Sequence, residues 1–191
     1  MIRHLFKLFF VLFALSFGQS VWANCTVNGV SYKTNGGSGT AITTAIIKNH
    51  ASSWNNATDL VTTCDVSSIT DMTEMFKDNS AINQDLSAWD TSNVTNMRKM
   101  FNNATGITSV SLPETGAVTD MSVMFSGATS LTSVFLPETG AAQYMSNMFM
   151  NATAITSVSL PKTGAAQYMG FMFMNATAVT SVSLPETGAV Q

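Results

Sequence analysis

The sequence predicts an α/β solenoid built from units of about 24 residues, each with one short strand and one short helix. The dipeptide Met-Phe recurs from positions 75, 100, 124, 148 and 172, and the string Leu-Pro-x-Thr-Gly recurs from positions 112, 136, 160 and 184. Residues 141–164 and 165–188 are identical at 20 of 24 positions. Such regularity is typical of solenoids, because each unit contacts only its neighbours and tolerates copying.

Within one unit, the apolar residues first follow the spacing of a helix and then that of a strand. Over residues 121–128 they stand at i, i+3, i+4 and i+7, which is one face of a short helix. Asp120 directly precedes them, where an Asp side chain caps the first turn. Residues 131–136 then alternate with a period of two, and Pro137 ends the strand. Stacked units are expected to form a parallel sheet over an apolar core.

Residues 1–23 have the order of segments of a secretory signal peptide. Basic residues come first, an apolar run over residues 8–17 follows, and the small residues Val21 and Ala23 stand at the positions that signal peptidase reads. The apolar run is too short to span a bilayer, which takes about 20 residues. We expect cleavage after Ala23, an exported protein, and no membrane insertion after signal cleavage.

Residues 24–65 are predicted to form an N-terminal cap on the repeats, which cover residues 66–191. This segment combines a strand-like stretch, a turn and a stretch with helical apolar spacing. It also holds the two cysteines of the chain, Cys25 and Cys64, which we expect to form a disulfide in an exported protein. A redox or metal pair is disfavoured, because the chain has neither a Cys-x-x-Cys spacing nor histidines beside these cysteines.

The sequence offers no catalytic or cofactor-binding equipment. No Ser-His-Asp set, zinc signature or phosphate loop can be assembled from it. We therefore expect no enzyme, no catalytic residues, no metal site and no cofactor. The net charge is −3 and cations are not clustered, which argues against nucleic acid as a partner.

Two conspicuous features are interpreted as structural. A sortase substrate carries one Leu-Pro-x-Thr-Gly string followed by an apolar span and a basic tail, whereas only residues 189–191 follow the last string here. The 13 methionines lie mostly at periodic positions that are expected to face the core, where a flexible thioether fills gaps.

Residues 69–101 read ITDMTEMFKDNSAINQDLSAWDTSNVTNMRKMF. This segment resembles the BspA-like leucine-rich-repeat surface proteins of bacteria, whose units run DMSxMFxxAxxFNQDLSxWDTSNVTxM. Later units, such as ATSLTSVFLPETG, are similar to a second repeat form of this group. The resemblance covers about residues 66–188. It implies a leucine-rich-repeat-type solenoid, secreted or on the bacterial cell surface, with adhesion or protein binding as the usual role and no shared active site.

The chain departs from this pattern in two places. Tyr144 and Tyr168 replace the Asp or Asn cap of the predicted helices, which is expected to cost each helix about 0.5–2 kcal/mol. The sequence also stops at Gln191 without a polar capping repeat, which solenoid ends normally carry. This predicts either a fragment of a longer protein or self-association through the open C-terminal repeat.

The outward positions of the strands form the predicted interaction face. They are serine hydroxyls with one aromatic ring: Ser109, Ser111, Ser133, Phe135, Ser157, Ser159, Ser181 and Ser183. We expect this face to bind protein or glycan on another surface. The alternatives are a structural array without its own ligand and an ice-binding solenoid, although ice binding requires a regular threonine ladder on a flat plane.

Overall fold

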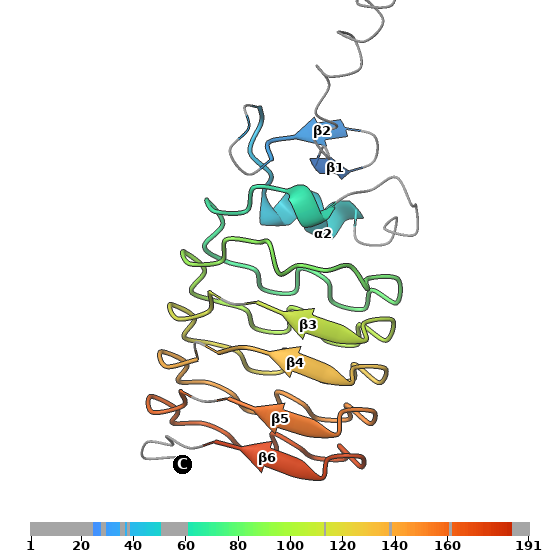
Figure 1. Cartoon of the computed structure of the whole chain (residues 1–191), viewed down its shortest axis with the longest axis vertical. Helices are drawn as coiled ribbons and strands as arrows, with labels where there is room; N and C mark the ends of the chain where they lie inside the picture. The colour runs from blue at the N-terminus through green and yellow to red at the C-terminus, as the bar shows by residue number, and fades with distance from the viewer. Residues whose placement is uncertain are drawn as a thin grey trace, which may run out of the picture.

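The computed structural model describes residues 25–27, 30–34, 37, 39–50, 61–112, 114–137, 139–160 and 162–184. The predicted signal peptide, residues 1–23, lies outside the described residues. Similar layers are stacked along the long axis of the molecule, with the N-terminal elements at one end (Figure 1).

The N-terminal segment contains a hairpin and a helix. β1 (Cys25–Val27) and β2 (Val30–Tyr32) pair antiparallel, and α2 (Thr44–His50) lies between this hairpin and the layers (Figure 1). Ile47 of α2 is fully buried in the same hydrophobic core as the layers. The helix therefore covers apolar side chains of the stack that water would otherwise reach.

Two links tie this segment to the start of the layers. The 3-10 helix η2 (Val61–Thr63) leads into Cys64, which forms a disulfide with Cys25, so the predicted disulfide is confirmed. Lys33 Nζ lies 2.6 Å from Asp65 Oδ2. This ammonium group, together with hydrogen bonds from Ser67, holds the pKa of the nearly buried Asp65 below its usual value.

Four short strands recur at a constant interval along the chain. They are β3 (Ser109–Ser111), β4 (Ser133–Phe135), β5 (Ser157–Ser159) and β6 (Ser181–Ser183). β3 pairs with β4 and β5 with β6, both in parallel and with each residue opposite its counterpart in the next unit. The predicted short strands are therefore present, in two separate two-stranded sheets.

The prediction of a short helix in each unit is wrong, because the described layers contain no helix at these positions. Residues 121–128 form consecutive turns instead. Met121 N–H donates to Tyr144 O at 2.8 Å and Phe125 N–H donates to Met148 O at 2.9 Å, so these groups bond to the next layer and not to the preceding turn of a helix. The apolar residues with helical spacing thus lie on consecutive turns, and these turns direct their side chains to the core.

Two columns of residues with positive φ allow this path. One column holds only residue types that adopt this conformation readily, namely Asp78, Asn103, Gly127, Asn151 and Asn175. At Gly127 an added Cβ would lie 2.2 Å from Asn103 Oδ1, so glycine also avoids a steric clash at this turn. The other column holds Glu74, Lys99, Val123, Asn147 and Phe171.

Val123 is the most strained residue type of the column to which it belongs, because it is β-branched and has a φ of 62°. Asn147 takes the same place in the next layer with a φ of 57°. Replacing Val123 with Asn is expected to raise the free energy of unfolding by about 1 kcal/mol, measured by urea denaturation. The reciprocal change, Asn147→Val, is the control and is expected to lower it by a similar amount. Shifts of the same sign in the two variants would contradict this explanation.

Stacked rings form the centre of the core. Adjacent ring centroids are 5.4, 5.6, 5.4 and 5.5 Å apart along the series Phe76, Phe101, Phe125, Phe149 and Phe173. Trp89 extends the series at the N-terminal end, 6.0 Å from Phe76. Methionines fill the space beside the rings, and those at positions 72–148 of the layers are mostly fully buried. Their interpretation as core residues is therefore confirmed.

The threonine of each Leu-Pro-x-Thr-Gly string that the structure describes is part of the scaffold. Thr115, Thr139 and Thr163 are fully buried, as is the equivalent Thr91 of the first unit. Thr91 Oγ1 donates to the backbone carbonyl of Glu114 at 2.7 Å, and Thr139 Oγ1 donates to that of Lys162 at 2.8 Å. The hydroxyls of Thr91 and Thr139 thus each link one layer to the next.

Candidate functional site

The structure places all eight residues of the predicted interaction face on β3 to β6, on one side of the stack. Seven of their side chains are exposed and Ser111 is half-buried. Between the serines, Val110 of β3 and Val158 of β5 are buried and Val134 of β4 is partly buried, whereas Val182 of the last strand, β6, is 44% exposed. This set of residues is called the strand face below.

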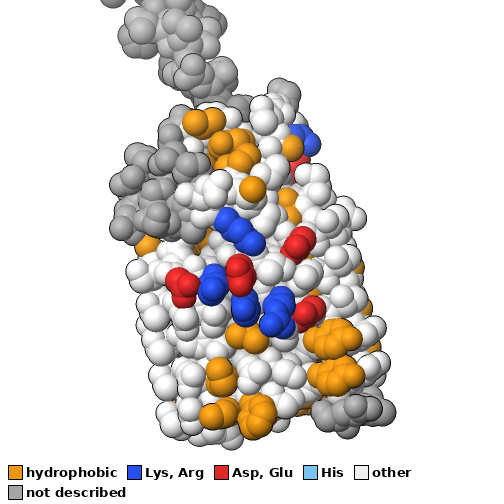
Figure 2. Space-filling view, turned by 180° about the vertical axis from the view of Figure 1, so that it is seen from behind, with side chains coloured by type: hydrophobic (Ala, Val, Ile, Leu, Met, Phe, Trp, Pro, Cys, Tyr) orange, Lys and Arg blue, Asp and Glu red, His pale blue; other side chains and the backbone are white. Residues whose placement is uncertain are grey.

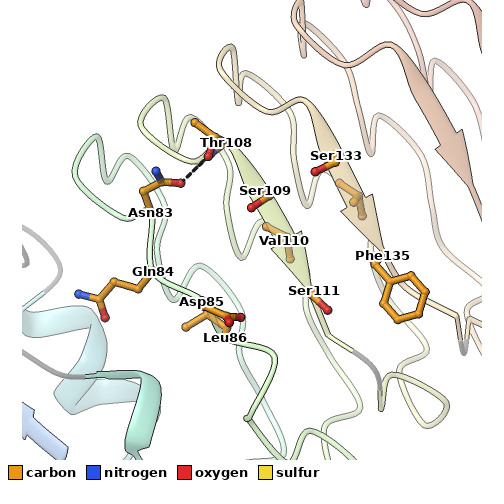
Figure 3. Close-up of a pocket in the computed structure, with 11 residues that line it drawn as sticks. Asn83, Gln84, Asp85, Leu86, Thr108, Ser109, Val110, Ser111, Ser133 and Phe135 are labelled. Atoms are coloured by element: carbon orange, nitrogen blue, oxygen red, sulfur yellow. Dashed lines mark hydrogen bonds between the residues drawn. The ribbon is translucent and has the colours of Figure 1, made fainter.

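A groove of about 450 Å³ opens at the N-terminal end of the strand face (Figure 3). It is lined by residues 83–86 of the first unit, residues 108–111 around β3, and residues 133–135 of β4. Its volume falls within the range of about 300–1,000 Å³ that is typical of small-ligand sites.

The groove exists because residues 83–86, which lie beside β3 in the first unit, do not form a strand. The layer that follows bonds directly to the backbone of Thr108, because Thr132 N–H donates to the Thr108 carbonyl at 2.9 Å. Toward the first unit, the acceptor for Thr108 N–H is a side-chain oxygen and not a backbone carbonyl. Asn83 Oδ1 accepts from Thr108 N–H and from Thr108 Oγ1, both at 2.9 Å (Figure 3). The backbone of the first unit therefore stands off from β3 by the length of an asparagine side chain.

The groove combines one exposed aromatic ring, one carboxylate and several hydroxyls. Phe135 is 56% exposed, at a position where the other strands carry serine. Asp85 belongs to the first unit, on the other side of β3 from Phe135 (Figure 3). Its Oδ1 accepts from Ser87 N–H at 2.9 Å, and this backbone hydrogen bond, with a second from the Ser87 side chain, lowers the pKa of Asp85. The carboxylate is thus ionised at neutral pH.

Charged side chains gather on the opposite side of the stack. Figure 2 shows basic and acidic groups together in the middle of the face that lies behind the strands. Lys99 Nζ lies 3.4 Å from Glu74 Oε1, and Lys77 Nζ lies 3.8 Å from the same oxygen. Exposed pairs of this kind contribute little stability. The strand face, in contrast, carries no charge of its own, and Asp85 is the single charged residue among the described residues that line the groove.

Tyr144 and Tyr168 occupy a column in which other layers have a turn cap. Asp120 Oδ1 accepts from Ser122 N–H at 2.8 Å, so the acidic residue caps a turn. The expected cost to a helix at the two tyrosines therefore has no basis, since the described residues of these layers form turns and not helices. The tyrosine rings stack on each other with centroids 5.1 Å apart, while both remain exposed.

Other chemistry finds no site in the part of the chain that the structure describes. No group of three or more His, Cys, Asp and Glu residues gathers there in a way that could hold a metal ion. Within the same residues, no helix combines the length and the apolar character needed to cross a membrane. Both cysteines are bound in the disulfide.

The layers and their strand face define the class: a repeat protein of short stacked units with one uncharged, hydroxyl-bearing side. A family model described as "Mycoplasma protein of unknown function, DUF285" matches residues 41–135 and again residues 108–183. The chain belongs to this family. No curated protein matches it.

Among the solved structures that are similar to the chain are three leucine-rich repeat proteins. A leucine-rich repeat protein from Eubacterium ventriosum shares 16% identity over 62% of this chain and 31% of its own, with a TM-score of 0.49. A leucine-rich repeat protein from Bacteroides ovatus shares 19% over 58% and 25%, with a TM-score of 0.37. A leucine-rich cell surface protein from Faecalibacterium prausnitzii shares 19% over 61% and 36%, with a TM-score of 0.41. The chain thus spans between about a quarter and a third of the length of these proteins.

The groove does not follow from the repeat pattern of the sequence. Alternation predicts the eight strand positions, but it does not single out residues 83–86. Two signals point to them. The first two Met-Phe pairs, at positions 75 and 100, are spaced more widely than the later pairs. The first unit also has Asn-Gln-Asp-Leu where later units have a Ser-Val-Ser strand or its equivalent.

Proposed function

We propose that this chain is a leucine-rich-repeat-type solenoid of the BspA-like kind, exported to a bacterial cell surface or secreted. In this proposal it is non-catalytic, and its strand face binds protein or glycan on another surface. The observation that carries the proposal is the strand face: a row of solvent-facing hydroxyls without charge, interrupted by Phe135, held on a packed core and hollowed at one end by the groove.

Two observations support export. Residues 1–23 have the composition of a signal peptide. The disulfide between Cys25 and Cys64 suits an oxidising compartment, because thiols are kept reduced in the cytosol. The two observations are independent, since one concerns the start of the chain and the other the elements that follow it.

Binding is favoured over ice recognition by the irregularity of the face. The described strands form two separate two-stranded sheets, and Phe135 interrupts the series of serines. These strands therefore do not carry the regular threonine ladder that ice binding requires. The ring of Phe135, which is 56% exposed beside the groove, offers a ligand an apolar contact surface, and this favours binding over a purely structural array.

The proposal is tested by placing charges on the strand face. The double variant Ser133→Asp, Ser157→Asp is compared with Thr129→Asp, Thr153→Asp, whose exposed positions lie in turns of the same two layers. Binding of residues 24–191 is measured on a panel of immobilised glycoproteins, the same glycoproteins after enzymatic deglycosylation, and polysaccharides. We expect the strand-face variant to bind at least about 10-fold more weakly, which is about 1.4 kcal/mol, while the turn variant binds as the wild type does. Equal binding by both variants, with unchanged melting temperatures, would rule the strand face out.

A further inference from the structure

We propose that the groove beside β3 is a subsite for a neutral saccharide, one or two pyranose rings in size, which stacks on Phe135 and hydrogen-bonds to Asp85. This inference rests on the proposed binding function and deepens it by naming the class of ligand. It is carried by the residues that line the groove and by their charges.

Phe135 supplies the stacking surface. The equivalent positions of β3, β5 and β6 hold Ser111, Ser159 and Ser183, so the fold of a layer does not require an aromatic ring here. More than half of the residue's surface is exposed, and exposure of a large apolar group costs free energy that a ligand recovers. One face of a pyranose presents aliphatic C–H groups, which pack against an aromatic ring.

Asp85 supplies the directional contact. The carboxylate accepts from Ser87 and is exposed, so it can accept further hydrogen bonds from sugar hydroxyls. Ser111 lies between Asp85 and Phe135 and adds a hydroxyl that donates or accepts (Figure 3). A ring seated on Phe135 therefore meets polar groups along its edge and an apolar surface below it, which is the distribution that a saccharide needs.

The charges of the groove select a neutral ligand. None of the described residues that line it is a lysine or an arginine, and its single charged group is an ionised carboxylate. An anionic ligand, such as a sialylated or sulfated sugar or an acidic peptide, would be repelled. Lys77 and Lys99 are not among the residues that line the groove, and each pairs with Glu74.

An extended peptide added to the edge of β3 fits the same groove less well. β3 has only three residues, and Asn83 already occupies one end of its edge by accepting from Thr108 N–H. Peptides that extend a sheet draw their affinity from a run of main-chain hydrogen bonds, which this edge is too short to provide.

The test titrates residues 24–191 with lactose, maltose, cellobiose and N,N′-diacetylchitobiose, followed by saturation-transfer difference NMR and calorimetry. At least one of these neutral disaccharides is expected to bind. Phe135→Ser is expected to weaken that binding at least about 10-fold, because it installs the residue that the other three strands carry and removes only the ring. Asp85→Asn is expected to weaken it to a smaller extent, and Phe135→Trp is expected to retain it.

The matched control moves the ring to a layer without the groove. Ser159→Phe, combined with Phe135→Ser, has an exposed ring at the same strand position but no Asp85 beside it, and it is expected not to restore binding. Absence of binding for all four sugars, or equal binding by wild type and Phe135→Ser, would overturn the saccharide inference. If the strand-face variant then still loses binding to the immobilised panel, the saccharide inference alone fails; if that variant also binds normally, the proposed function fails.

Discussion

Replacing Phe125 with alanine is expected to lower the free energy of unfolding by about 3–5 kcal/mol. Phe125 is fully buried at the middle of the ring series, with Phe101 on one side and Phe149 on the other. Its removal leaves a void between two layers that the closely packed neighbouring rings cannot close. The loss is measured by urea denaturation followed by far-ultraviolet circular dichroism.

Phe135→Ala is the matched control for this prediction, because it removes the same atoms from a ring that projects into solvent. Its free energy of unfolding is expected to change by no more than about 0.5 kcal/mol. Because a stack of units unfolds through its weakest interface, the transition of the Phe125 variant is also expected to broaden or divide. Equal losses for the two variants would show that the ring series does not stabilise the layers.

Loss of the disulfide is expected to destabilise the protein by about 4 kcal/mol. The bond joins cysteines that are 39 residues apart, and opening a loop of that length restores chain entropy to the unfolded state. It also releases β1 from the segment that enters the first layer, next to the ion pair of Lys33 and Asp65. The measurement compares the urea midpoints of oxidised and dithiothreitol-reduced protein.

The double variant Cys25→Ala, Cys64→Ala provides the control for reduction. Its midpoint is expected to match that of the reduced wild type and not to respond to dithiothreitol. A wild-type midpoint that is unchanged by reduction would contradict the prediction, and it would mean that burial of Ile42 and Ile47 in the shared core is enough to hold the N-terminal elements in place.

The period, the core residues and the strands could be predicted because they depend on the residue pattern alone. The turns that replace the predicted helix could not be predicted, because the apolar spacing i, i+3, i+4, i+7 fits both a helix and a chain of turns whose N–H groups donate to the next layer. The distinguishing signal was present in one of the two positive-φ columns. Residues of types that favour a left-handed backbone and weaken a helix recur there with the layer period, namely Asp78, Asn103, Gly127, Asn151 and Asn175.

The strand positions of the candidate site followed from alternation, but the groove did not. It depends on a contact between units, in which the Asn83 side chain takes the place of a backbone carbonyl. The residue pattern of one unit does not determine the distance between its backbone and the backbone of the next unit. Alternation predicts Phe135 as the one aromatic residue of the face, whereas Asp85, which lines the same groove, lies in the first unit, where no strand forms.

The exchangeability of the layers has a genetic consequence. Each layer offers its N–H groups to the equivalent carbonyls of the next layer, so excising or duplicating residues 141–164 in frame leaves every neighbour with an equivalent partner. A gene that encodes near-identical tandem segments is prone to slippage during replication. Each such event would change the height of the molecule by about 4.8 Å, the spacing of paired strands. The groove near the other end of the stack would stay as it is, so such events change the length of the stack without altering the groove.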